Sequence, residues 1–173
     1  IGLAAVEIEL ATTPQRERRL ARVLGGFASA YDHVLIDCPP SLGLLTVNAL
    51  TAADGVLIPL QCEYYALEGL GQLLATIDLV RDNLNPDLAV DGVVLTMFDA
   101  QAKLSNEVVA ELTGFFEASL GKGSPWSAAK IYKTRIRRNI KLAECPSFGQ
   151  TIFAYDATSN GAQDYKSFAK EVI

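Results

Sequence analysis

Three short apolar segments, separated by stretches with helical periodicity, constrain the fold of this chain more than any other feature. They are VLID (34–37), GVLIPL (55–60) and the centre of LAVDGVVLTMF (88–98). The first two do not alternate apolar with polar residues, which is typical of strands covered on both faces. LGLLTVNALTA (42–52) and residues 66–83 predict helices between them, and crossover helices of this length make the joined strands parallel. The sequence therefore predicts a doubly wound α/β fold, with a mostly parallel sheet and helices on both faces.

Helix-start signals and periodicity place the remaining elements. Thr13-Pro14 predicts a helix with the threonine hydroxyl as N-cap and the proline in the first turn. Ser105 is predicted to be the N-cap of a later helix. In chain order we expect a helix over 14–29, a helix over 105–120, a loop at 121–129, a strand over 130–136, an irregular segment over 137–151 and a last helix over 159–172.

The composition is that of a soluble globular protein. Of the 173 residues, 50% are hydrophobic and 20% are charged, and no linker or repeat interrupts them, so we expect one domain over residues 1–173. No apolar run approaches the roughly 18 residues that span a bilayer. The chain begins IGLAAVEIEL, without Met, and we expect it to be a partial domain from a longer protein. The cysteines are odd in number and lack zinc spacing, which predicts reduced thiols in the cytoplasm: Cys38, Cys62 and Cys145.

An aspartate stands at the end of the first apolar segment, in YDHVLIDCPPSL (31–42). A buried strand has no structural need for a terminal carboxylate, but Asp37 in this place is typical of the Walker-B motif, which holds Mg²⁺ beside a nucleotide's phosphates. Taken alone the motif is weak, because Asp37 capping the next helix near Ser41 explains it about as well. Pro39 and Pro40 favour the nucleotide role, since they fix the backbone after the aspartate and remove two N–H donors.

Polar residues also follow the other predicted strands. In doubly wound sheets, ligands bind beyond the carboxyl ends of the strands. Met97 and Asp99 follow one strand, and residues 137–139 follow another. We therefore expect these residues and Asp37 to converge on one site.

The usual phosphate-binding motifs are missing from these residues. The pattern G-x-x-x-x-G-K-[ST] does not occur: Phe116 stands where its first glycine belongs before Gly121-Lys122. The dinucleotide fingerprint G-x-G-x-x-G fails as well, because Leu74 occupies its third position. The single histidine, His33, stands at the start of a predicted strand, which argues against a catalytic triad, and one histidine cannot form a site with several histidine ligands.

One basic cluster lies on an otherwise acidic chain. The formal net charge is −5, and without the six cations of residues 130–141 it would be −11. Such a cluster predicts an anionic partner, and one reading is a contact with the phosphate backbone of DNA. Tyr132 is the one aromatic residue among the cations, so base stacking is not indicated and any such binding is expected to be independent of sequence. A solvated strand edge is the alternative. The cations are Lys130, Lys133, Arg135, Arg137, Arg138 and Lys141.

Several long motifs, in order along the chain, resemble those of the ParA/Soj chromosome- and plasmid-partitioning ATPases. IDCPPSLGLLTVNAL (36–50) is similar to the family's IDCPPSLGLLTxNAL, and PLQCEYYALEG (59–69) to its V-P-x-Q-C-E-[YF] strand end and ALEG helix start. LTMFD (95–99) resembles LTMYD. Segments near both ends of the chain match as well, so the resemblance covers essentially all of it: IELATTPQRERRLARVL (8–24), RIRRNIKLAECPSFGQ (135–150, family IPRNVRLSEAPSFGK) and YDATSNGAQDYKSFAKEV (155–172).

The resemblance implies a nucleotide site with ATP and Mg²⁺ in the complete protein. Asp37 would be the Walker-B aspartate, acting on Mg²⁺ through water, and Pro39 and Pro40 would belong to the switch segment behind it. Met97, Arg138 and Asn139 would bind the nucleotide by lining the adenine site.

The resemblance also implies partners. ATP binding would drive formation of a homodimer that binds non-specific DNA on the nucleoid, in the cytoplasm and without a membrane partner. A ParB-like centromere-binding protein would stimulate ATP hydrolysis. Residues 63–68 would lie near the subunit interface, and the DNA surface would include Arg135, Arg137, Arg138 and Lys141.

The chain departs from the family pattern in places. Arg137 replaces the family's proline before Arg-Asn, which alters the adenine wall and adds charge, and Gln101 replaces an arginine often found there. The family's P-loop, KGGVGKTT, has no counterpart in these 173 residues. Because the P-loop supplies most of the stabilisation of phosphoryl transfer, we expect this chain alone to bind ATP weakly or not at all and not to hydrolyse it.

Two alternatives remain open. One is a nucleotide-free module for protein interaction, derived from the same fold by loss of the P-loop. The other is a MinD-like positioning ATPase. The tail QDYKSFAKEVI (163–173) argues against it, because this sequence predicts a packed terminal helix rather than an amphipathic membrane helix.

Overall fold

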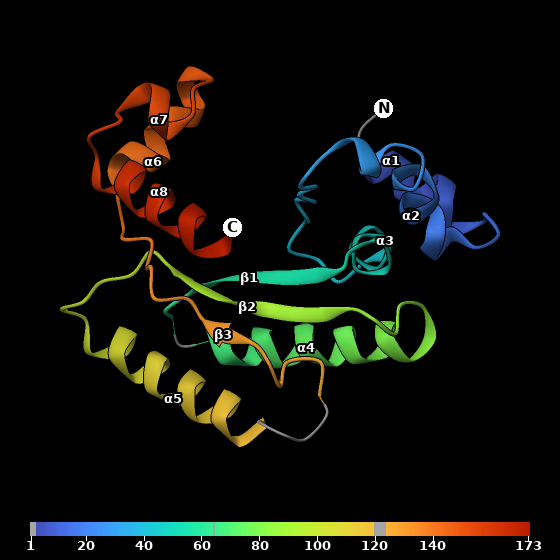
Figure 1. Ribbon diagram of the computed structural model, residues 1–173, viewed down its shortest axis with the longest axis horizontal. Coiled ribbons are helices and arrows are strands. Elements are labelled where there is room, and N and C mark those ends of the chain that lie inside the picture. Colours follow the sequence, from blue (N-terminus) through green and yellow to red (C-terminus); the bar gives the residue numbers. More distant parts are fainter. Residues whose placement is uncertain (1–2, 64, 120–123) are drawn as a thin grey trace. The chain divides into compact units, whose positions relative to one another are not determined.

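The computed structural model describes residues 3–63, 65–119 and 124–173 (Figure 1). Gly121-Lys122 and the start of the predicted loop at 121–129 lie outside the described residues. The chain forms two compact units: the first comprises residues up to 56 together with 70–89, and the second comprises 57–69 together with 90–173.

A three-stranded sheet, mainly in the second unit, has the order β1-β2-β3. Its strands are β1 (Gly55–Gln61), β2 (Ala89–Thr96) and β3 (Lys130–Ile131). β2 and β3 run parallel, with Gly92 opposite Lys130 and Val93 opposite Ile131. Only glycine fits at position 92, because its φ is 158° and a Cβ there would collide with the Lys130 carbonyl. The predicted parallel α/β arrangement is confirmed.

The burial of the strands follows their order in the sheet. β2 is central, and its residues Val93 to Leu95 are at most 2% exposed, so both of its faces are covered. β1 is an edge strand in which buried Ile58 and Leu60 alternate with exposed Leu57 and Pro59. The prediction that β1 is covered on both faces is therefore wrong. A proline fits an edge strand, because it has no N–H to donate to a neighbour.

The helices of the second unit flank the strands. α5 (Lys103–Ser119) lies on one side of β2 and β3, and the other side carries α6 (Ile140–Glu144), α7 (Ile152–Tyr155) and α8 (Asn160–Val172) (Figure 1). Two buried clusters hold the second group: Val94, Tyr132 and Ile136 form one, and Cys145, Ile152 and Ala162 form the other. Leu142 of α6 packs against both clusters.

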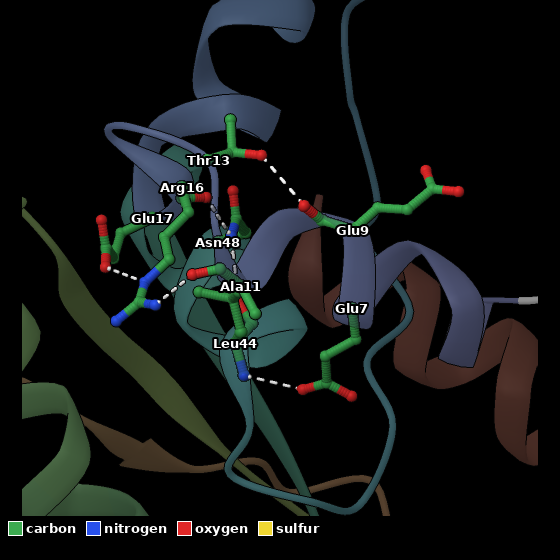
Figure 2. Close-up of polar contacts among 8 residues, drawn as sticks. All are labelled: Glu7, Glu9, Ala11, Thr13, Arg16, Glu17, Leu44 and Asn48. Atoms are coloured by element: carbon green, nitrogen blue, oxygen red, sulfur yellow. Dashed lines mark hydrogen bonds and ion pairs between the residues drawn. The ribbon is translucent and has the colours of Figure 1, made fainter.

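In the first unit, Asn48 connects three segments of backbone. Its element α3 (Leu44–Ala52) is preceded by α1 (Leu3–Ala11), a 3₁₀ turn (Arg16–Arg18), α2 (Arg19–Leu24) and a second 3₁₀ turn (Ala28–Ala30). The Asn48 amide donates to the carbonyls of Arg16 (2.8 Å) and Leu44 (2.9 Å) and accepts from the Leu20 N–H (3.1 Å). Figure 2 shows Asn48 beside Arg16, and Glu7 of α1 accepting the Leu44 N–H at 3.0 Å.

α4 (Ala66–Asn83) begins in the second unit and continues in the first, with the bounds predicted from the sequence. After it, the Asn85 side chain donates to the carbonyls of Leu50 and Ala53, at 3.0 and 2.8 Å. No helix in the described ranges is long and apolar enough to cross a membrane.

The predicted strand at 34–37 is not formed. Residues 33–39 have no regular secondary structure, and Leu35 is 94% exposed. The prediction failed because a strand needs a neighbour to take its backbone hydrogen bonds, and no described segment forms a ladder with these residues.

Several helix boundaries differ from the prediction because backbone conformation and tertiary contacts override local signals. Thr13 is not an N-cap, because its hydroxyl donates to the Glu9 carbonyl near the end of α1. α1 itself was not predicted from the sequence. Gln15, in the predicted first turn, has a left-handed backbone conformation (φ 53°). Ser105 is buried inside α5, two residues after its start. The last helix, predicted over 159–172, is α8, and Ser159 is its N-cap, accepting from the Ala162 N–H at 3.2 Å.

The segments flanking Arg137 also differ. The predicted strand at 130–136 is reduced to Lys130–Ile131, with an isolated bridge from Phe98 to Arg137 farther along. The segment 137–151, predicted to be irregular, contains α6 and the 3₁₀ turn Cys145–Phe148. These turns are too short to show helical periodicity.

Replacement of Asn48 by alanine tests its role in the first unit. Asn48→Ala leaves the Leu20 N–H and the Arg16 carbonyl without their partner, and we expect the free energy of unfolding in urea to fall by about 1–3 kcal/mol. Thr76→Ala is the matched control, because the Thr76 hydroxyl bonds only within α4 and is exposed. Equal effects of the two changes would contradict the proposed connecting role.

A second test concerns Glu171 of α8, which accepts the N–H groups of Lys133 (2.7 Å) and Thr134 (2.9 Å). Burial alone would raise the pKa of Glu171, but these N–H groups outweigh it and hold the pKa below its ordinary value of 4.5. The ionised carboxylate therefore stabilises the fold fully above pH 4.5, and this contribution is lost as the pH falls below it. We expect Glu171→Gln to lower stability near pH 7 and to lose this effect in acid, measured by urea unfolding at several pH values. A difference that does not change with pH would be the contrary result.

Candidate functional site

A cavity of about 190 Å³ lies in the second unit, at the carboxyl ends of β1 and β2. This volume is smaller than the roughly 300–1,000 Å³ of sites that enclose a whole drug-sized ligand, so it suits a single ring system. Both acidic and basic side chains are present in its wall. We call it the strand-end pocket, and its lining residues are Gln61, Cys62, Glu63, Met97, Asp99, Ala102, Ser105 and Arg138.

Met97 enters the strand-end pocket from an unusual backbone conformation. Its φ is 48°, in the left-handed region that non-glycine residues rarely occupy, and its side chain is 51% exposed. Such a conformation persists only where the surroundings enforce it, and it occurs often at ligand sites. The flexible thioether is suited to cover a planar ring.

The turn after β3 is held against the end of β2 by backbone hydrogen bonds. The Phe98 N–H donates to the Ile136 carbonyl (3.0 Å), and the Arg138 N–H donates to the Phe98 carbonyl (3.4 Å). Arg138 thereby reaches the same pocket as Met97. The structure thus brings together Met97 and Arg138, two residues that the sequence predicted for one site.

Asn139 and Arg137 have other partners. The Asn139 side chain is the N-cap of α6, accepting the Lys141 N–H at 2.8 Å. The Arg137 guanidinium pairs with Asp164 at 2.7 Å, and this hydrogen bond raises the pKa of Arg137. Neither residue lines the strand-end pocket, so the turn contributes to the pocket through Arg138.

Most cations of the basic cluster already have intramolecular partners. Lys130 lies over the Tyr132 ring (4.6 Å) and Arg135 over the Phe98 ring (4.3 Å). Lys141 pairs with Glu144 at 3.0 Å, a hydrogen bond that raises the pKa of Lys141 and lowers that of Glu144. Among the described residues, none forms an ion pair or hydrogen bond with the side chains of Lys133 and Arg138, which leaves these two cations available to an external anion.

Asp37, Pro39 and Pro40 lie in the first unit, in the segment without regular structure, and all three are exposed. Asp37 does not cap α3, because the N-cap is Gly43 and the Leu44 N–H is taken by Glu7. Its carboxylate has no hydrogen-bond partner among the described residues. A free carboxylate is the kind of group that holds Mg²⁺ through water beside a phosphate, so the donor chemistry of Asp37 fits this role.

The cysteines are free thiols, as predicted. Cys38 is exposed, whereas Cys62 and Cys145 are buried. Burial raises the pKa of Cys62, with an opposing effect of Arg135, so this pocket residue stays neutral near pH 7. Within the described ranges no three His, Cys, Asp or Glu side chains are grouped so that they could hold a metal ion.

Sequence reasoning missed part of the pocket. Gln61, Cys62 and Ser105 were not expected there, and Glu63 was assigned to a subunit interface. The position of residues 61–63 directly after the strand at 55–60 is the signal that places them at a ligand site of a parallel sheet. Ser105 carries no such signal, because its place depends on how α5 packs.

Comparison with known proteins gives a consistent relationship. The model of the family described as AAA domain matches residues 1–90. The chromosome partitioning protein ParA of Myxococcus xanthus is 49% identical over 99% of this chain and 56% of its own length. The sporulation initiation inhibitor protein Soj of Bacillus subtilis is 52% identical over 99% of this chain and 64% of its own length. The chain thus spans between about half and two thirds of these relatives.

A solved structure supports the same fold. The cobyrinic acid a,c-diamide synthase from Mycobacterium smegmatis, with bound ATP analog and magnesium, has a TM-score of 0.74 and 34% identity. The match covers 98% of this chain and 58% of that protein. With its parallel sheet and helices the chain has the P-loop NTPase fold. It matches the AAA domain model over residues 1–90 and belongs to the ParA/Soj family.

Proposed function

We propose that this chain supplies the base-binding pocket and the magnesium-side aspartate of a partitioning ATPase. The observation that carries the proposal is the strand-end pocket, in which Met97 and Arg138 meet at the carboxyl ends of parallel strands. Nucleotides bind at this edge in doubly wound sheets. The ATP analog and magnesium named for the 34% identical solved structure support the same ligand class.

The chemistry of the pocket favours the base over the phosphates. The lining includes two carboxylates, of Glu63 and Asp99, and one guanidinium, of Arg138, and this balance disfavours the negative charge of phosphate groups. Carboxylate and amide oxygens accept hydrogen bonds from an exocyclic amine of the kind adenine carries. Adenine would therefore occupy the pocket, with Met97 against its ring and Arg138 at its edge.

Asp37 would be the magnesium-side carboxylate of the ATPase, as its place in the motif IDCPPSLGLLTVNAL (36–50) implies. Mg²⁺ supplies charge neutralisation at the β- and γ-phosphates when it is bound, and Asp37 would hold the ion through water. Hydrolysis also needs a glycine-rich phosphate loop, and the sequence G-x-x-x-x-G-K-[ST] does not occur in these 173 residues. Activity therefore requires residues beyond this chain.

In the complete protein, we infer that ATP binding drives a homodimer that binds DNA without sequence preference. A ParB-like centromere-binding protein would stimulate hydrolysis. The basic cluster supports the DNA partner, because Arg138 and Lys133 have side chains free of intramolecular ion pairs within the described residues. Arg135, Arg137 and Lys141 add positive charge around them.

A nucleotide-free interaction module is the second candidate, and the absence of a phosphate-loop motif from these 173 residues favours it. The genomic sequence upstream of the codon for Ile1 separates the two proposals. A KGGxGKT motif in the same reading frame supports the ATPase, and a nearby start codon without that motif supports the module.

We expect the purified 173-residue chain to show no ATP hydrolysis above background, because it lacks the groups that hold the phosphates. Phosphate release with and without Mg²⁺ is the measurement, and Asp37→Ala should leave it unchanged. In the complete gene product, the same substitution should reduce Mg²⁺-dependent hydrolysis by about a hundredfold or more. Turnover by the isolated chain that Asp37→Ala abolishes would refute the expectation.

A DNA-binding assay on the complete gene product tests the basic cluster. Arg138→Ala combined with Lys141→Ala should weaken ATP-dependent DNA retention, and the salt dependence of binding should fall by about one for each DNA phosphate that is no longer neutralised. Because Lys141 already pairs with Glu144, Arg138→Ala alone should account for most of the weakening. Lys103→Ala is the control, since this exposed lysine pairs with Glu107 on α5. Unchanged retention in the double variant would assign the cluster to a solvated edge.

A further inference from the structure

Two carboxylates of α8 hold the segment that follows β3. Glu171 binds the backbone at Lys133 and Thr134, as described above. Asp164, which is only 8% exposed, binds both the backbone and the side chain of Arg137. Its Oδ2 accepts the Arg137 N–H (3.0 Å) and Nε–H (3.0 Å), and its Oδ1 accepts from Nη2 (2.7 Å).

The residue held by Asp164 is the chain neighbour of Arg138, which lines the strand-end pocket. Arg137 forms the parallel bridge to Phe98, and Phe98 directly follows Met97. Arg138 directly follows Arg137. By holding Arg137, the buried carboxylate of Asp164 restrains Arg138, the next residue in the chain. It also restrains Met97, because Arg137 pairs with Phe98, the residue that follows Met97.

We propose that Asp164 is a positioning residue for the strand-end pocket, which it shapes through Arg137 without touching the ligand. The inference rests on the proposed function only in taking a nucleotide base as the ligand. The Arg137 guanidinium is paired with Asp164, so it contributes to the geometry of the pocket in addition to its charge in the basic cluster. Arg138 carries the free charge next to it.

The geometry of the pair supports a positioning role. The guanidinium and the carboxylate meet in a two-point contact that fixes orientation as well as distance. The third bond, from the Arg137 N–H, fixes the backbone itself. Loss of Asp164 would release every hydrogen bond that joins it to Arg137, leaving the Phe98 and Ile136 backbone contacts to hold the turn.

Glu171 provides a matched comparison. It lies on the same helix and also accepts two backbone N–H groups of the segment after β3, but Lys133 and Thr134 do not line the pocket. If Asp164 only attached α8, then Asp164→Ala and Glu171→Ala would have the same kind of effect. A positioning role predicts that Asp164→Ala alone changes the pocket.

The chain contains its own reporters for this comparison. Met97 is its single methionine and Trp126 its single tryptophan, so ¹³C-methyl labelling of methionine gives one NMR signal, from the pocket. Without ligand, we expect Asp164→Ala to shift and broaden the Met97 methyl signal and Glu171→Ala to leave it close to wild type. Trp126 fluorescence reports whether each variant is folded. If Asp164→Ala unfolds, Asp164→Asn replaces it in the comparison, because asparagine keeps one acceptor oxygen. An unchanged Met97 signal in folded Asp164 variants would overturn the proposal.

Titration with ADP and Mg²⁺, followed by the same methyl signal, separates this proposal from the proposed function. We expect weak binding by the wild-type chain, and a Kd about tenfold higher in the Asp164 variant but within about twofold of wild type in the Glu171 variant. Equal Kd values in all three proteins would refute the positioning role and leave the base site standing. No response of wild-type Met97 to ADP would refute the base site in this chain, and the ligand-free comparison would still decide the role of Asp164.

Discussion

The burial of β2 on both faces is the constraint on which the second unit depends. Val94 packs with Tyr132 and Ile136, while Val93 and Leu95, which point to the opposite face, are fully buried. Burial of each such side chain stabilises the fold by about 1.5–3 kcal/mol. The carbonyls of Val93 and Leu95 accept the N–H groups of Tyr132 and Ile136, at 2.9 and 2.8 Å. The same strand therefore fixes the position of the segment that carries Arg138.

The strand-end pocket follows from this arrangement. Met97 comes directly after β2, and Arg138 comes directly after the residue that bridges to Phe98. Their convergence needs no contact between their own side chains, because the backbone pairing alone brings them to one edge. The two neighbouring arginines have different roles. Arg137 is paired with Asp164 within the protein, whereas Arg138 is available to a ligand.

Sequence reasoning succeeded where an element satisfies its own requirements. α4 was predicted with the observed bounds because its apolar positions recur at helical spacing, and the last helix, predicted over 159–172, is observed as Asn160–Val172. Reasoning failed where the outcome depends on a distant partner. VLID (34–37) has the composition of a buried strand, yet a strand cannot form without a neighbouring strand. At the start of α3, the Leu44 N–H is bound by Glu7, which is 37 positions away in the chain, so no local signal indicates this contact.

The sequence by itself determined the family, the parallel α/β fold and the expectation that Met97 and Arg138 share a site, because these depend on motifs and on the order of strands along the chain. Tertiary structure decided which charges are free. Six cations in one segment look equivalent in the sequence, but Tyr132, Phe98, Asp164 and Glu144 are placed against four of them. The partners of Arg135 and Arg137 come from distant segments and depend on packing between elements, whereas those of Lys130 and Lys141 are neighbours in the chain that the local backbone conformation brings within reach.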